Sequence, residues 1–143
     1  MNMVMKYTVI IAVMLLAVSI SACSTPTPHE RLLSHQEKII SLLEENKEDI
    51  PAAAKAVKSY VDGNIEEITK LAEESLADAK NPVLTDSMYV DRTTALLQKH
   101  LELETGYVLL LNDPGVMQAL APISEVFETS KAAGAESSKE EVK

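Results

Sequence analysis

Cysteine, aromatic residues and glycine are all scarce in this chain of 143 residues, and each scarcity excludes something. The single cysteine, Cys23, rules out a disulfide within the chain, so burial alone must hold the fold. Tryptophan is absent, and four tyrosines and one phenylalanine are the only aromatic residues. A core of Leu, Ile, Val and Ala is therefore expected, which suits close-packed helices better than a sheet. The four glycines are not clustered, which leaves no glycine-rich phosphate-binding loop.

Enzyme signatures and a basic surface are also missing. The sequence contains neither a His-Glu-x-x-His zinc motif nor a Gly-x-Ser-x-Gly nucleophile motif. Its 22 acidic residues outnumber 13 lysines and arginines, for a net charge of −9. This balance argues against nucleic acid as a partner and against direct binding to anionic lipid head groups. We therefore expect a non-catalytic protein that uses no cofactor.

The first 22 residues have the layout of a secretory signal peptide. A short segment with one cation, Lys6, precedes an apolar run over residues 7–22. That run is sixteen residues long, shorter than the roughly 20 that a transmembrane helix needs. We expect residues 1–22 to be cleaved.

The end of this segment is more specific. Ile20-Ser21-Ala22-Cys23 resembles the lipobox of bacterial lipoproteins, in which the cysteine is diacylated and becomes the mature N-terminus. The resemblance implies lipidation at Cys23 and attachment to a membrane through the lipid, which two acyl chains make stable. Ser24 rather than Asp after the cysteine implies the outer membrane, facing the periplasm, if the organism is Gram-negative. Residues 23–29 would then be the acylated cysteine and a Pro/Thr linker.

Helical patterning covers residues 30–128, which we interpret as one domain. A first helix runs from about His29 to Asn46. A second helix follows, and Asp49 is the candidate N-cap at its start. Gly63 leaves open whether residues 50–80 form one helix or two, and an unbroken apolar stripe favours one.

A third helix is capped by Asp86 or Ser87 and runs to about Leu111, with a weak point at Gly106. Asn112-Asp113-Pro114 ends it and begins a fourth helix. The predicted apolar side of the third helix consists of Tyr89, Val90, Leu96, Leu97, Leu101, Val108 and Leu111.

These patterns predict an all-α fold, a small antiparallel bundle of three to four helices. Residues 129–143 offer almost nothing to bury, and we expect a disordered charged tail.

A row of polar residues interrupts the predicted apolar side of the third helix. Thr93, His100 and Glu104 fall in its middle, and the last two are four residues apart and therefore neighbours. Buried polar groups need partners, so the row indicates either a ligand site or a satisfied polar pair at an unburied helix surface. Asn64 and Ser75 lie on the stripe of the second helix, where they could bond to this row or fix the helix register. Too few ligands are present to predict a metal site.

The sequence thus favours a lipid-anchored cell-envelope protein with a non-catalytic helical domain that binds or scaffolds an unidentified envelope partner. One alternative is a carrier of a small ligand or metal that uses the polar row. Another is a structural envelope spacer that self-associates. The oligomeric state is left open.

Overall fold

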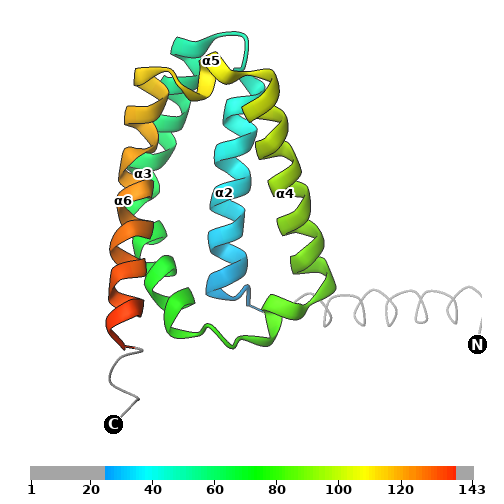
Figure 1. Ribbon diagram of the computed structural model, residues 1–143, viewed down its shortest axis with the longest axis vertical. Helices are drawn as coiled ribbons and strands as arrows, with labels where there is room; N and C mark the ends of the chain where they lie inside the picture. Colours follow the sequence, from blue (N-terminus) through cyan, green and yellow to red (C-terminus); the bar gives the residue numbers. More distant parts are fainter. Residues whose placement is uncertain (1–24, 138–143) are drawn as a thin grey trace, which may run out of the picture.

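The computed structural model describes residues 25–137, with side chains up to residue 129. The predicted signal peptide and Cys23 lie outside the described residues. Within them the fold is an all-α helical bundle, as the sequence predicts (Figure 1). No helix of residues 25–137 is long and apolar enough to cross a bilayer.

Helix α2, Pro28–Glu45, begins with a capping box. The hydroxyl oxygen of Thr27 accepts a hydrogen bond from the backbone N–H of Glu30, and the Glu30 carboxylate accepts one from the backbone N–H of Thr27 at 2.8 Å. The backbone N–H of Thr27 and its hydroxyl both donate to the Glu30 carboxylate, and these two hydrogen bonds lower the pKa of Glu30. Pro28 takes the first helical position, where its missing N–H costs nothing. The linker predicted for residues 23–29 therefore gives way to helix at Pro28.

Helix α3, Ile50–Ala77, is a single helix that continues through Gly63. The Asp49 side chain caps it by accepting a hydrogen bond from the backbone N–H of Ala52 at 3.0 Å. The single helix that the sequence favoured is thus confirmed. A turn and a short 3₁₀ helix, η1, Pro82–Thr85, follow it.

Helix α4, Ser87–Gly106, is capped by the Asp86 carboxylate. Tyr107 is not helical, and the four-residue helix α5, Val108–Leu111, follows it. The weak point at Gly106 is therefore a real helix end.

Helix α6, Pro114–Ser137, begins where Asp113 accepts hydrogen bonds from the backbone N–H groups of Gly115 and Val116. It runs on past Thr129, so the disordered tail predicted from residue 129 does not begin there. Lysine, glutamate and alanine have high helix propensity, which lets a helix extend beyond its last core contact. Residues 138–143 lie outside the described part of the chain.

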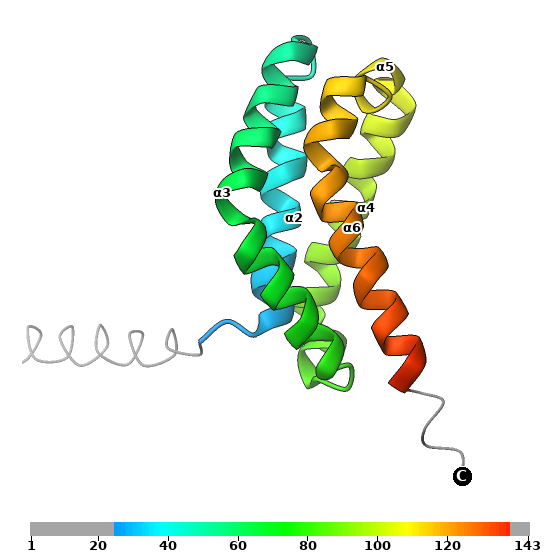
Figure 2. The ribbon, with the colours of Figure 1, turned by 90° about the vertical axis from the view of Figure 1, so that its left-hand side faces the viewer.

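The four long helices run alternately up and down, as Figure 1 shows. Helix α3 packs against both α2 and α6, whereas α4 packs mainly against α2. Figure 2 shows α6 and α4 on the same side of the α2–α3 pair, and Figure 1 shows them set apart on that side.

One apolar core joins the helices, and aliphatic side chains fill it. The residues buried in this cluster are Ile39, Leu43, Ala53, Val57, Val61, Leu103, Leu110, Val116 and Ala119. Burial of aliphatic surface is therefore the main stabilising contribution, as the scarcity of aromatic residues predicted.

Candidate functional site

Helix α4 is fastened to α2 by two ion pairs. The Arg92 guanidinium donates from Nε and Nη2 to the two carboxylate oxygens of Glu37, at 2.9 and 2.6 Å, and Nη2 also donates to the hydroxyl of Ser34. This two-point hydrogen bonding raises the pKa of Arg92. Two helical turns further on, Lys99 donates to Glu44 at 2.9 Å. The single arginine and the single lysine of α4, Arg92 and Lys99, therefore both form ion pairs with α2.

The buried side of α4 differs from the predicted one. Leu103 is 2% exposed, and it was not part of the predicted apolar side. Leu97 is 58% exposed and Leu101 is 49% exposed, although both were expected to face the core. The prediction was wrong for Leu97 and Leu101, whereas Leu96 and Leu111 are partly buried. Helix α4 packs mainly against α2, and that contact leaves the Leu97 side exposed. Val90 is half-exposed as well, and so is Val108, which lies in the short helix α5.

The exposed side of α4 borders an apolar depression of about 400 Å³, which we call the central groove. Its floor is α2 and its two walls are α4 and α6, so it occupies the open side of the bundle in Figure 1. It is lined by Gln36, Ile39, Ile40 and Leu43 of α2, Thr93, Leu96, Leu97 and His100 of α4, Leu111 of α5, and Leu120, Ile123 and Phe127 of α6.

The predicted polar row lies at the surface beside this groove. Thr93 and His100 line the groove, whereas Glu104 does not. His100 Nε2 lies 3.3 Å from a carboxylate oxygen of Glu104, and both side chains are about half exposed. Thr93 donates its hydroxyl proton to the carbonyl of Tyr89 within α4. Thr93 is therefore satisfied within its own helix and His100 has a carboxylate neighbour, while Thr93 and His100 both line the central groove.

Asn64 does not join the row. Its side-chain amide donates to the backbone carbonyl of Tyr60 at 2.7 Å, within α3. Of the two roles suggested for Asn64, the hydrogen bond to the polar row is not formed, because the carbonyl one turn earlier accepts from its amide. His35 lies nearby, and its Nδ1 and the Tyr60 hydroxyl share a hydrogen bond of 2.7 Å.

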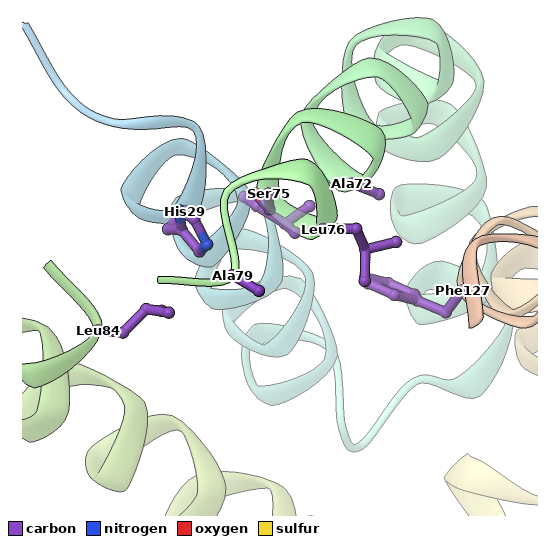
Figure 3. A pocket seen from close by; sticks show the side chains of 8 residues that line it. His29, Ala72, Ser75, Leu76, Ala79, Leu84 and Phe127 are labelled. Carbon is purple, nitrogen blue, oxygen red and sulfur yellow. The ribbon is translucent and has the colours of Figure 1, made fainter. Parts of the chain in front are cut away.

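A second depression, which we call the end cavity, lies where α2 begins and α3 ends (Figure 3). Its volume is about 520 Å³. In Figure 3, His29 and Leu84 lie on one side of it and Phe127 on the other. Phe127 also lines the central groove, so the two depressions are neighbours. The apolar lining residues of the end cavity are Leu32, Ala72, Leu76, Ala79, Leu84 and Phe127.

Two polar side chains also line the end cavity, His29 and Ser75. His29 is 6% exposed. Its Nδ1 and the Ser75 hydroxyl oxygen are shielded from solvent and have no hydrogen-bond partner among residues 25–137. The sequence analysis did not single out His29, although its spacing to Leu33 and Leu43 places it on the apolar side of α2. Ser75 was noted but expected to bond within the protein.

Among residues 25–137, no group of three or more His, Cys, Asp or Glu side chains is placed to hold a metal ion. Comparison with protein-family models, with curated proteins and with solved structures found no match to this chain.

Proposed function

We propose that this protein is a non-catalytic, lipid-anchored protein of the cell envelope whose helical domain binds a basic amphipathic helix of a partner protein in the central groove. The lipobox at Cys23 supports the anchor. The observation that carries the binding proposal is the apolar side of α4, where Leu97 lines an apolar groove and stays 58% exposed. Exposed apolar surface next to a depression is typical of interaction sites.

The shape of the groove favours a helix as its occupant. On one wall, Thr93 and Leu97 are four residues apart on α4; on the other, Ile123 and Phe127 are four apart on α6. Each pair therefore forms a ridge along its helix. A third helix that presents apolar side chains at the same spacing can insert them between the two ridges, as helix-in-groove complexes do.

The charge of the walls favours a basic partner over a second copy of the chain. The lysine and arginine of α4 are paired with α2. Residues 114–129 of α6, whose side chains the structure describes, contain no lysine or arginine. A second copy would bring another net charge of −9, which opposes self-association. The exposed acidic residues elsewhere on α4 and α6, outside the groove lining, are Asp91, Glu102, Glu104, Glu125 and Glu128.

Photo-crosslinking of the full chain in its native cells tests this proposal. A photoreactive phenylalanine derivative replaces Phe127, which lines the groove, and crosslinked peptides are identified by mass spectrometry. We expect a peptide with an amphipathic helical pattern and basic residues. Adding Leu97→Glu should lower the crosslinked fraction at least about tenfold, because it places a carboxylate without a partner in the apolar contact.

Leu109→Glu is the matched control. Leu109 is 81% exposed and does not line the central groove, so this variant should leave the crosslinked fraction unchanged. If Leu109→Glu lowered the crosslinked fraction as much as Leu97→Glu does, the loss would come from the added charge itself and not from its place in the groove. Crosslinks to a second copy of the chain would overturn the assignment of a partner helix and favour the envelope spacer.

The anchor has a separate test. Labelled fatty acid should be incorporated into the wild type and not into Cys23→Ala, and the variant should leave the membrane fraction. Equal labelling of both proteins would remove the anchor from the proposal while leaving the groove assignment to be judged by its crosslinks.

A further inference from the structure

The position of Cys23 in the chain ties it to one end of the bundle. It precedes Thr25, the first described residue, by two positions, and α2 begins three residues later at Pro28. Two residues of fully extended chain span at most about 7 Å, so in any conformation Cys23 stays within that distance of Thr25. A lipid on Cys23 therefore holds the start of α2 close to the bilayer surface.

Several other segments lie at this end of the bundle. Figure 1 shows the end of α3, the short helix η1 and the beginning of α4 there, and α5 at the opposite end. Helix α2 contacts η1, and Leu84 of η1 lines the end cavity together with His29 and Leu32 of α2. The 18 residues of α2 separate the two ends by about 27 Å. A short tether at the start of α2 thus brings η1 to the bilayer and leaves α5 away from it.

Three apolar side chains at this end are in contact with solvent, and we call them the anchor-end patch. Met88, in the first turn of α4, is 73% exposed, and Leu76, in the last turn of α3, is half-exposed. Leu84 lies between them in the sequence, is partly buried and borders the end cavity with Leu76 (Figure 3). Because apolar surface is unfavourable in water, this patch gains free energy when it enters an apolar environment.

From this arrangement we propose that the anchor-end patch inserts into the bilayer that holds the lipid, with zwitterionic lipid as its partner. The inference rests on the lipid anchor proposed above. Apolar surfaces of this kind reach about 5–10 Å into the boundary between head groups and acyl chains. The anchor makes the insertion an intramolecular step, so a small patch suffices. With this end docked, the central groove stays accessible to a partner helix.

The charges at this end favour zwitterionic over anionic lipid. Residues 77–87, which connect α3 to α4, contain two aspartates, Asp78 and Asp86, and one lysine, Lys80. Arg31, near the start of α2, forms an ion pair with Glu67. Anionic head groups attract clusters of basic residues, and the connecting segment has a net negative charge instead. Insertion therefore depends on the apolar side chains of the patch.

Because the chain contains no tryptophan, a single introduced tryptophan can report on its own surroundings. Full-length lipidated protein with Met88→Trp is reconstituted in phosphatidylcholine vesicles whose acyl chains carry bromine near their upper ends, where it quenches tryptophan on contact. We expect the emission to be at least about twofold lower than in vesicles without bromine, because insertion places the indole at this depth. Leu109→Trp is the matched control, since Leu109 is even more exposed but lies in α5, and its emission should not change.

A carboxylate in the patch tests whether its apolar character drives the insertion. Leu76→Trp reports on the same patch from α3, and adding Met88→Glu should reduce its quenching at least about threefold, because a carboxylate is unfavourable among acyl chains. Leu109→Glu, added to the same reporter, should leave the quenching unchanged. Met88 and Leu109 are both exposed, so circular dichroism should show the same helical content in both double variants. Vesicles that also contain phosphatidylglycerol should give no more quenching than phosphatidylcholine alone.

Flotation of the vesicles in a density gradient separates failure of the docking from failure of the anchor. If the Met88→Trp protein floats with the vesicles and bromine does not quench it, the anchor stands and the docking is overturned. If the protein does not float, the anchor fails and the docking fails with it. Equal quenching of Met88→Trp and Leu109→Trp would mean that the bundle lies flat on the bilayer, which also overturns the proposal. Emission of Met88→Trp that bromine does not reach and that shifts with the protein-to-lipid ratio would mean that a second copy of the chain covers the patch.

Discussion

The orientation of α4 decides which side chains border the central groove, and a pair of leucine substitutions tests it. Leu103 is 2% exposed and packs in the core, whereas Leu97 is 58% exposed. We expect Leu103→Ala to lower the free energy of unfolding by about 3–5 kcal/mol, from lost burial plus the cavity that remains. Leu97→Ala should cost about 1 kcal/mol or less, because less than half of its surface is buried and no enclosed cavity forms.

The comparison is controlled within the helix. Both substitutions are Leu to Ala in the interior of α4, so the change in helix propensity is the same and cancels in the difference. The free energies of unfolding of the two variants should therefore differ by at least about 2 kcal/mol, and this difference reports the burial of the leucine side chain alone.

Urea unfolding of the full chain in a mild detergent, followed by far-ultraviolet circular dichroism, measures this gap. The dependence on urea concentration should be the same in both variants, so that midpoints convert directly to free energies. If Leu97→Ala costs as much as Leu103→Ala, then α4 is turned as the sequence pattern alone predicted, and Leu97 cannot be an exposed wall of the groove.

Three further predictions concern polar contacts. A double-mutant cycle with Arg92→Ala and Glu37→Ala should give a coupling energy of about 1 kcal/mol that shrinks as salt is added; a value of zero would show that this pair does not fasten α4 to α2. His100→Ala should change the free energy of unfolding by less than about 0.5 kcal/mol, since its ion pair is half-exposed; a loss above 2 kcal/mol would mean that His100 is buried. The lowered pKa of Glu30 means that its hydrogen bonds with Thr27 stabilise the fold when the carboxylate is ionised. That stability should be lost as the pH falls through the lowered pKa, and Thr27→Ala, by removing the cap hydroxyl, should cost about 1 kcal/mol near neutral pH and flatten the pH profile.

The helices and the residues at which they begin follow from the sequence, because the capping signals that set the starts are local. Asp49, Asp86 and Asp113 cap helices through hydrogen bonds that span two or three residues. Gly106 marks a helix end in the same way. The aliphatic composition fixes an all-α bundle with one core. None of these conclusions requires knowing where another helix lies.

Only the tertiary structure decided which face of each helix is buried, and therefore where the two candidate sites lie. Helix α4 carries leucines on more than one side, and contact with α2 selects Leu103 while leaving Leu97 exposed. His29 and Ser75 are far apart in the sequence, and only the meeting of the start of α2 with the end of α3 brings them to one cavity. Burial depends on which neighbours a side chain meets, and periodicity within one helix cannot specify those neighbours.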